Sequence, residues 1–251
     1  MKTIAIIPAR LNSTRLPRKL LSKLDDKYII QHVYENVSQV SQIARTLIAT
    51  DSDEIMAICK DLNFDAILTP DYFQSGTDRI WYAYSQLGRN YDLILNVQGD
   101  EPFISDNLLN DFLNFLSLNK FDVGTIISSN INSNEIADPN VVKVVCDSHN
   151  YAMYFSRSAI PYIRDKSEIE TTDISKLNIY FKHIGIYAYK PEALHKFAEL
   201  PQSQLEKLEK LEQLRLLQNG YKYLCFQTNQ ELLSIDTAQD LAEAQIRFNQ
   251  E

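Results

Sequence analysis

Positive charge is concentrated in one short segment of an otherwise acidic sequence. Six basic residues and no acidic residue lie in the first 24 positions, although the formal net charge of the chain is -8. Four of these cations follow the strand-like run 3–8 within ten residues: Arg10, Arg15, Arg18 and Lys19. Ser13 and Thr14 add hydroxyl donors between them. Such a cluster at the carboxyl end of a strand predicts a site for a phosphate-rich ligand, and the alternative is a solvated surface loop.

Two aspartates could hold a divalent metal ion beside that segment. Asp100 closely follows the apolar run 93–97, and Asp236 precedes the last predicted helix. A carboxylate at the end of a buried strand can coordinate a hard cation that bridges phosphate oxygens. Taken alone, Asp100 also fits a turn and Asp236 a helix N-cap. Together with the basic segment they predict a Mg²⁺ site.

The polar segment QSGTDR, residues 74–79, enters a predicted helix. Its Ser, Gly and Thr amide groups are free to face a ligand at the start of that helix. The alternative interpretation is ordinary helix capping.

A further group of polar residues could bind a second, polar substrate. Arg157 ends a strand-like run and could bind a carboxylate through two hydrogen bonds. His183 and Tyr187 are four residues apart on one strand, which places them on one face. Glu209 and Glu212 complete the group. The alternatives are a core histidine and a solvated glutamate face on a helix that spans residues 204–219 and buries the leucines at 205, 208, 211 and 214.

Several classes of protein are disfavoured. The sequence contains neither the dinucleotide-binding motif G-x-G-x-x-G nor the phosphate-binding motif G-x-x-x-x-G-K-[ST]. An acidic chain with one local basic segment is unlike a nucleic-acid-binding protein, and no apolar run is long enough to span a membrane. The cysteines Cys59, Cys146 and Cys225 lack metal-site or disulfide-framework spacing. We therefore expect a cytoplasmic protein without a membrane span.

Hydrophobic periodicity predicts one α/β domain over residues 1–251. Strand-like runs at 3–8, 46–50, 66–69 and 93–97 alternate with helical patterns at 28–40, 53–62 and 77–87, as in a parallel sheet covered on both faces. After a helix near 107–118, the runs 122–129, 141–146, 152–156 and 179–189 follow without long helices. They predict an antiparallel lobe over about 122–190, with a mobile loop at 164–176. Helices at 191–200 and 204–219, a strand at 222–227 and a helix starting near 237 complete the expected order.

Taken together, these motifs resemble the CMP-Kdo synthetases, the 3-deoxy-manno-octulosonate cytidylyltransferases. The resemblance runs in order through the whole chain, in IPAR…STRLP…K (7–19), ATD (49–51), QSGTDR (74–79), NVQGDEP (96–102), DPNVVKVV (138–145), YFSRSAIPY (154–162), KHIGIYAY (182–189), LEKLEQLR (208–215) and IDT (235–237).

The resemblance implies an α/β fold with a mostly parallel, Rossmann-like nucleotidyltransferase sheet, helices on both faces and a smaller antiparallel β-lobe that forms a homodimer. It implies that CTP and Kdo, both small molecules, give CMP-Kdo and pyrophosphate for lipopolysaccharide synthesis, with Mg²⁺ on Asp100 and Asp236. Catalysis would involve these aspartates with Arg10 and Lys19. The residues implied for CTP are Arg10, Ser13, Thr14, Lys19, Gln74, Ser75, Gly76, Thr77 and Arg79. The residues implied for Kdo are Gln98, Arg157, His183, Tyr187, Glu212 and Gln213.

Two positions bear on how far the resemblance extends. Arg18 stands where the family usually has glycine, so we expect either backbone strain or an additional phosphate contact. Glu101 favours Kdo over its 8-amino analogue, 8-amino-3,8-dideoxy-manno-octulosonate. That analogue, another acidic sugar, a different sugar-nucleotide enzyme and a non-catalytic sensor remain the alternatives.

Overall fold

The structure is a computed structural model that describes residues 1–11, 13, 15–73, 75–88, 90–164 and 179–249. Its strands are β1 (Thr3–Ala9), β2 (Lys23–Leu24), β3 (Lys27–Tyr28), β4 (Ile43–Thr50), β5 (Ala66–Leu68), β6 (Leu93–Asn96), β7 (Val123–Ser128), β8 (Lys143–Cys146), β9 (Ala152–Ser156), β10 (Phe181–Tyr189) and β11 (Tyr223–Thr228). Its helices are η1 (Lys19–Leu21), α1 (Ile29–Ser38), α2 (Asp53–Asp61), α3 (Gly76–Ser85), α4 (Asp106–Ser117), α5 (Ser133–Ala137), α6 (Pro191–Glu199), α7 (Gln204–Glu209), α8 (Gln213–Gln218) and α9 (Ala238–Phe248).

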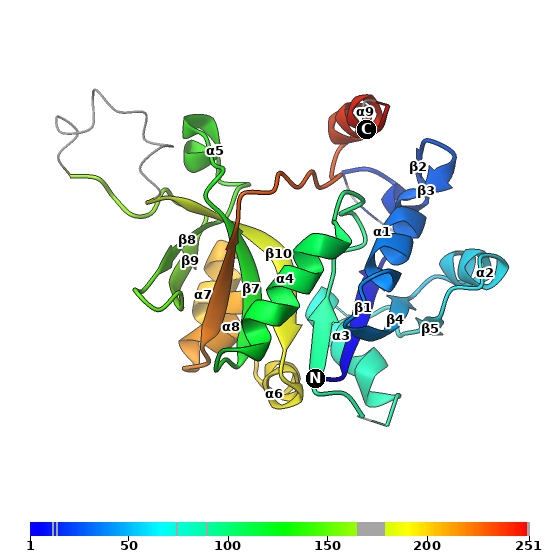
Figure 1. Cartoon of the computed structure of the whole chain (residues 1–251), viewed down its shortest axis with the longest axis horizontal. Coiled ribbons are helices and arrows are strands. Elements are labelled where there is room, and N and C mark those ends of the chain that lie inside the picture. Colours follow the sequence, from blue (N-terminus) through cyan, green and yellow to red (C-terminus); the bar gives the residue numbers. More distant parts are fainter. Residues whose placement is uncertain (12, 14, 74, 89, 165–178, 250–251) are drawn as a thin grey trace.

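A mostly parallel sheet forms the centre of the molecule (Figure 1). Its strands follow the order β11-β7-β10-β6-β1-β4-β5, and β8 and β9 extend it from β10. β10 pairs antiparallel with β6 and β7, whereas β1, β4, β5, β6, β7 and β11 share one direction. The predicted fold class is confirmed. The predicted antiparallel pairing after residue 122 is confirmed for β7 with β10, for β8 with β10 and for β8 with β9, and β7 also pairs parallel with β11.

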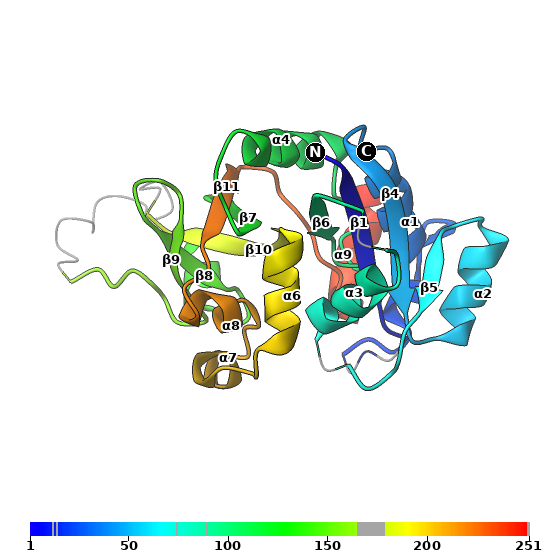
Figure 2. The same ribbon diagram turned by 90° about the horizontal axis from the view of Figure 1, so that it is seen from below.

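The alternating side chains of each strand build two cores. In β1, Ile4 and Ile6 pack on one face of the sheet, and Ala5 and Ile7 pack on the other. Helices α3, α6 and α8 cover the first face, and α1, α2 and α4 cover the second. Figure 2 shows α4 and α6 on opposite sides of the sheet. Both faces of the parallel strands are therefore buried, and ligands can approach only at their ends.

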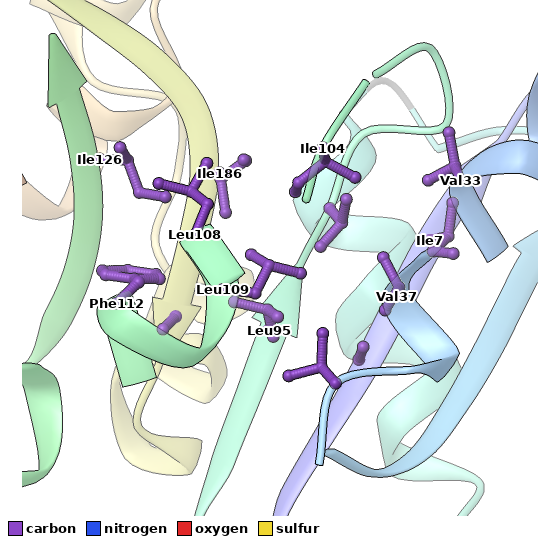
Figure 3. Close-up of a cluster of buried hydrophobic side chains, with 14 of the residues drawn as sticks. Ile7, Val33, Val37, Leu95, Ile104, Leu108, Leu109, Phe112, Ile126 and Ile186 are labelled. Atoms are coloured by element: carbon purple, nitrogen blue, oxygen red, sulfur yellow. The ribbon is translucent and has the colours of Figure 1, made fainter. Parts of the chain in front are cut away.

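Helix α4 fixes the position of β6, the strand that leads to Asp100. The side chain of Ser105 accepts a hydrogen bond from the backbone N–H of Leu108 and so caps the helix. The apolar stripe of α4, which includes Leu109 and Phe112, packs against Leu95 of β6 (Figure 3). A polar loop is thus attached to a rigid, close-packed support.

The single helix predicted over 204–219 is wrong, because the chain divides it into α7 and α8. Lys210 ends α7 in the left-handed conformation, with φ 54°. The predicted pattern of buried leucines and solvated glutamates is wrong for α7: Leu208 is 73% exposed, whereas Glu206 is only 5% exposed. The physical reason is a bidentate ion pair that holds Glu206 on the buried Arg215 of α8.

The segment after β11 crosses the end of the sheet before it enters α9 (Figure 1). It is attached there by the backbone N–H of Ile235, which donates to the carbonyl of Asp100 at 3.0 Å. The N-cap of α9 is Thr237, which forms a capping box with Asp240. Asp236 is therefore not the cap, and its carboxylate is available to the cleft described below.

The other predicted strands and helices lie within a few residues of their expected bounds. The predicted mobile loop at 164–176 falls, except for Arg164, outside the described residues. Within the described part of the chain, none of the helices combines the length and hydropathy that a bilayer span requires.

Candidate active site

A cleft of about 660 Å³ opens at the carboxyl ends of the parallel strands. Four parts of the chain line it: Pro8, Arg10, Ser13, Arg15, Lys19 and Leu20 after β1; Ser75 and Gly76 at the start of α3; Gln98, Gly99 and Asp100 after β6; and Gln202, Glu206, Lys207, Lys210, Glu212 and Asp236 from the last quarter of the sequence. This is the edge at which open α/β sheets bind their ligands.

The ammonium group of Lys19 brings the two predicted metal-binding aspartates together. Its Nζ donates hydrogen bonds to the carboxylates of Asp100 and Asp236, the second at 2.8 Å. Arg15 pairs with the other oxygen of Asp236 at 2.9 Å. Burial of Lys19 lowers its pKa, but the two carboxylates outweigh this effect and raise the pKa above its ordinary value. Two carboxylates that are 136 positions apart in the sequence therefore share one cation in one cleft.

The residue before Lys19 holds the loop in an unusual backbone conformation. Arg18 has φ 57° and ψ 28°, the left-handed region that favours glycine. Arg18 thus adopts the backbone conformation for which strain was expected. The Arg18 side chain pairs with Glu54 of α2 and is not among the residues that line the cleft. The left-handed turn starts η1, in which Lys19 faces the cleft while Leu21 packs into the core.

The loop that carries Asp100 leaves little room for a side chain at Gly99. A Cβ atom there would lie 3.1 Å from Cδ1 of Ile30 and 3.2 Å from Cδ1 of Leu20. The next residue, Glu101, is 8% exposed, and burial together with the nearby carboxylates raises its pKa to about 8. Its Oε2 has no hydrogen-bond partner among the described residues.

Arg10 is a cation of the basic segment without an ion-pair partner among the described residues. Its guanidinium forms no hydrogen bond or ion pair with any residue in the described part of the chain, and it lines the cleft. Burial and the neighbouring Arg79 lower its pKa, and Asp51 partly offsets them. Arg79 itself is fully buried and bonds to Asp51 and Thr69, which leaves it no surface for a ligand. Arg10 is therefore positioned to bind an anion, whereas Arg79 is not.

The segment before α3 both caps that helix and lines the cleft, so it fills the two roles that the sequence suggested. Ser75 caps the helix by accepting from the backbone N–H of Asp78, and Ser75 and Gly76 also line the cleft. Thr77 is fully buried, and its hydroxyl donates to Glu212 at 2.7 Å. Gln74 and Thr14, both predicted to contact CTP, lie outside the described residues.

The six residues predicted for the second substrate divide into two groups. Gln98 and Glu212 line the cleft. Burial raises the pKa of Glu212, and the hydrogen bond from Thr77 opposes this effect. The side-chain amide of Gln98 donates to Asn96 at 3.1 Å, which orients it on the end of β6.

The other four residues are not among those that line the cleft. Tyr187 and Gln213 are 4% and 3% exposed. The ring of His183 packs edge-on against Phe155, and burial lowers its pKa to about 3, so it has the properties of a core histidine. The guanidinium of Arg157 donates to the backbone carbonyls of Pro139, Glu209 and Lys210.

Sequence reasoning missed four polar or charged residues that line the cleft: Gln202, Glu206, Lys207 and Lys210. Three of them, Glu206, Lys207 and Lys210, belong to the segment that was expected to be a continuous helix with a solvated face, and Gln202 precedes it. The only available signal was the positive charge of two lysines at three-residue spacing, which is indistinguishable from a solvated helix surface.

The two aspartates fit a magnesium ion that takes its remaining ligands from substrate and water. Carboxylate oxygens are the ligands that Mg²⁺ prefers, and nucleotide enzymes commonly hold it through one or two of them. Within the described residues, no group of three or more His, Cys, Asp or Glu side chains could hold a metal ion. The Lys19 ammonium already occupies the position between Asp100 and Asp236 that suits a cation.

Comparison with known proteins identifies similar sequences over nearly the full length. The sequence profile of the cytidylyltransferase family matches residues 4–228. The 3-deoxy-manno-octulosonate cytidylyltransferase of Chloroherpeton thalassium is 41% identical over 246 residues, which cover 97% of this chain and 96% of the relative. The proteins of the same name from Parabacteroides distasonis and Francisella tularensis subsp. holarctica are 42% and 44% identical and cover 97% of both chains.

Solved structures agree with this similarity. A CMP:2-keto-3-deoxy-manno-octonic acid synthetase complexed with CTP superposes with a TM-score of 0.90 at 34% identity, over 100% of this chain and 99% of the other. A cytidylyltransferase from Leptospira borgpetersenii, at 16% identity and a TM-score of 0.62, covers 96% of this chain and 83% of its own and shares the fold alone. The resemblance expected from the motifs is confirmed.

Proposed function

This chain belongs to the cytidylyltransferase family and, within it, to the 3-deoxy-manno-octulosonate cytidylyltransferases, and from this premise we propose that it couples CTP to Kdo. The products are CMP-Kdo and pyrophosphate. The observation that carries the proposal is identity of 41–44% over 97% of the chain, which includes the segments that line the cleft.

The protein catalyses this reaction by positioning the substrates and stabilising charge, without forming a covalent bond to either of them. The anomeric hydroxyl of Kdo attacks the α-phosphorus of CTP in line and loses its proton to solvent; an O–P bond forms, and the bond to the departing pyrophosphate breaks. Arg10, Lys19 and Ser13 bind the triphosphate from the first loop, with Ser75 and Gly76 beside the nucleotide. Their work is to orient the phosphates and to stabilise the negative charge that develops on them.

Asp100 and Asp236 are proposed to hold Mg²⁺. When bound, this ion neutralises charge on the phosphate oxygens. The aspartates would exchange the cations that they hold in the present structure, Lys19 and Arg15, for the metal ion. Both cationic side chains would then be available to the triphosphate.

The remaining expectations form part of the same proposal. Gln98 and Glu212 contact the sugar from within the cleft, whereas roles for Arg157, His183, Tyr187 and Gln213 in sugar binding stay predictions from the family resemblance. The protein acts in the cytoplasm, where CTP is available, and forms a homodimer through the β8–β9 lobe. Kdo is the preferred sugar, and its 8-amino analogue is the second candidate.

The test is incubation of the purified protein with CTP, Mg²⁺ and a panel of sugars: Kdo, its 8-amino analogue, N-acetylneuraminate and a neutral ketose. We expect one pyrophosphate for each CMP-Kdo formed, and the highest kcat/KM with Kdo. Asp100→Asn should abolish turnover, whereas the exposed Asp111→Asn serves as the matched control. Release of CDP would instead indicate transfer of the terminal phosphate, and nucleotide binding without product would indicate a sensor; either result contradicts the proposal.

A further inference from the structure

The C-terminal helix α9 covers a small hydrophobic cluster that is separate from the two cores of the sheet. We call it the α9 cluster; its buried members are Leu24, Ile29, Ile235 and Ala244, and Leu16, Phe103, Leu233, Leu241 and Phe248 pack against them. Three of these residues belong to α9, and the others come from segments near the end of the sheet where the cleft opens. The helix therefore packs on the segments around the cleft and not on the body of the sheet (Figure 1).

The three segments that carry the paired charges of the cleft all enter the α9 cluster. Leu16 lies in it, and its carbonyl accepts a hydrogen bond from the backbone N–H of Lys19 at 3.1 Å. Ile235, which directly precedes the second aspartate, is fully buried in it, and its backbone N–H donates to the carbonyl of Asp100 at 3.0 Å. Phe103 contributes from the segment after Asp100. One apolar cluster thus joins three segments that are far apart in the sequence.

Polar contacts attach α9 to the same segments. At its start, the carboxylate of Asp240 accepts a hydrogen bond from the backbone N–H of Asp236 at 2.9 Å. Near its end, the side-chain amide of Gln245 donates to the carbonyl of Lys23 at 3.0 Å. The helix is therefore bonded both to the segment of the second aspartate and to the chain that follows η1.

The last turn of α9 reaches the loop of the first aspartate. The guanidinium of Arg247 lies 4.7 Å from the ring centre of Phe103 and donates to the carbonyl of Glu231 at 3.2 Å. The ring of Phe248 packs edge-on against His32 of α1, with 5.2 Å between ring centres. Arg247 and Phe248 thus connect the loop after β6, the segment after β11 and α1.

We propose that α9 is a positioning element that sets the separation of Asp100 and Asp236, and so determines the affinity of this pair for a divalent ion. The proposal rests on the proposed function, since it concerns the proposed metal site. Mg²⁺ requires near-octahedral ligand geometry, and both aspartates lie on loops, so an element that fixes the loops to each other lowers the cost of binding the ion. Arg247 and Phe248 are positioning residues, because they contact the supporting segments and not the cleft.

The test measures binding of Mn²⁺ to the CTP-loaded, full-length protein by electron paramagnetic resonance, together with the Mg²⁺ dependence of turnover. The variants are Arg247→Met, Phe248→Ala and their combination, with Phe248→Leu as the conservative variant. The double variant should weaken Mn²⁺ binding about tenfold, the effect typical of residues that orient metal ligands. It should need correspondingly more Mg²⁺ for half-maximal velocity, whereas kcat at saturating Mg²⁺ should stay close to that of wild type. Phe248→Leu should retain most of the affinity.

Two controls separate positioning from a general loss of stability. Ile246→Ala changes a residue of the same helix that is 60% exposed and outside the α9 cluster, so it should keep wild-type affinity for Mn²⁺. Leu194→Ala removes a fully buried side chain of α6 from one of the two cores of the sheet. It should lower the melting temperature without changing the affinity for Mn²⁺.

Wild-type affinity for Mn²⁺ in the double variant would overturn the proposal, and so would an equal loss of affinity in Leu194→Ala. If the double variant does not fold, Arg247→Met alone decides in the same way, because this side chain is only partly buried. Wild-type protein that binds Mn²⁺ through the two aspartates but forms no CMP-Kdo would contradict the proposed function alone.

Discussion

The two sides of the cleft use cationic side chains in different ways. On the nucleotide side, Arg10 has no partner in the described residues, and Lys19 is held by two carboxylates that we propose to be metal ligands. Behind the opposite side, Arg215 is bound to Glu206, and Lys143 donates to three backbone carbonyls. Arg10 is available to a ligand, and Lys19 would become available once a metal ion took its place between the two aspartates, whereas the second set stabilises the fold.

This difference gives a rule for interpreting buried charge in this molecule. A cation whose donors are all used within the protein contributes to the free energy of unfolding, and its loss leaves a buried anion or carbonyl unpaired. A cation without an internal partner contributes to ligand binding. Substitutions on the two sides should therefore separate stability from affinity.

The largest expected effect on stability is that of Arg215→Met. The substitution leaves Glu206, 5% exposed, as an unpaired buried charge, so we expect a loss of about 3–5 kcal/mol in the free energy of unfolding. Urea denaturation measures this loss. Because the penalty comes from the unpaired carboxylate, adding Glu206→Leu should recover much of it; a double variant as unstable as the single one would contradict the explanation.

Arg10→Met should weaken the binding of CTP without lowering the free energy of unfolding. Loss of a charge-assisted contact with the triphosphate should raise KM for CTP by about 10- to 100-fold. The free energy of unfolding should stay constant or rise slightly, because the substitution removes repulsion from Arg79. Arg45→Met, which breaks an ion pair with Asp65 away from the cleft, is the control. A clear loss of stability in Arg10→Met would place this residue with the structural cations.

His183 should make the sugar side sensitive to acid. Burial lowers the pKa of His183 to about 3 in the folded protein, whereas the ordinary pKa of histidine is 6.5. Between these two pH values the unfolded chain binds a proton at this residue and the folded protein does not. The free energy of unfolding is therefore unaffected by this residue above pH 6.5 and falls by about 1.4 kcal/mol per pH unit as the pH decreases toward 3. Measured from pH 7 to 4.5, His183→Gln should show a shallower decline than wild-type protein. Equal slopes would mean that this histidine is not responsible; the exposed His195→Gln is the control.

The smallest expected effect concerns Arg18, with φ 57°. Arg18→Gly and Arg18→Ala both remove the ion pair with Glu54, but only glycine relieves the left-handed conformation. Arg18→Gly should therefore be more stable than Arg18→Ala by about 1 kcal/mol, measured by thermal unfolding. If alanine equals glycine, the backbone at this position is not strained.

The same contrast explains what could be predicted from the sequence. The parallel strands are short apolar runs, and the residues that follow them necessarily meet at one edge, so Lys19 and Asp100 could be assigned to one site. On the sugar side, the break at Lys210 requires a positive φ that lysine does not signal. The burial of Glu206 depends on Arg215, a tertiary partner that helical periodicity does not reveal.

Local alternatives were also resolved by tertiary contacts. Asp236 and Thr237 are adjacent and both are good N-cap residues, and only the capping box between Thr237 and Asp240 assigns the cap. His183 is a polar residue on a strand, and its environment follows from the packing of Phe155 and Tyr187 around it. Neither outcome could be read from spacing alone.

The central claim is that Asp100 and Asp236 hold one divalent ion against the nucleotide, and binding of Mn²⁺ to the CTP-loaded protein tests it most directly. Electron paramagnetic resonance of free Mn²⁺ would give the affinity for wild type, Asp100→Asn, Asp236→Asn and the control Asp111→Asn. We expect Asp100→Asn and Asp236→Asn each to weaken Mn²⁺ binding at least about tenfold, because loss of a residue that only hydrogen-bonds to a metal ligand already lowers metal affinity by that factor. The control should leave the affinity unchanged. Wild-type affinity for Mn²⁺ in either Asp100→Asn or Asp236→Asn would contradict the shared site.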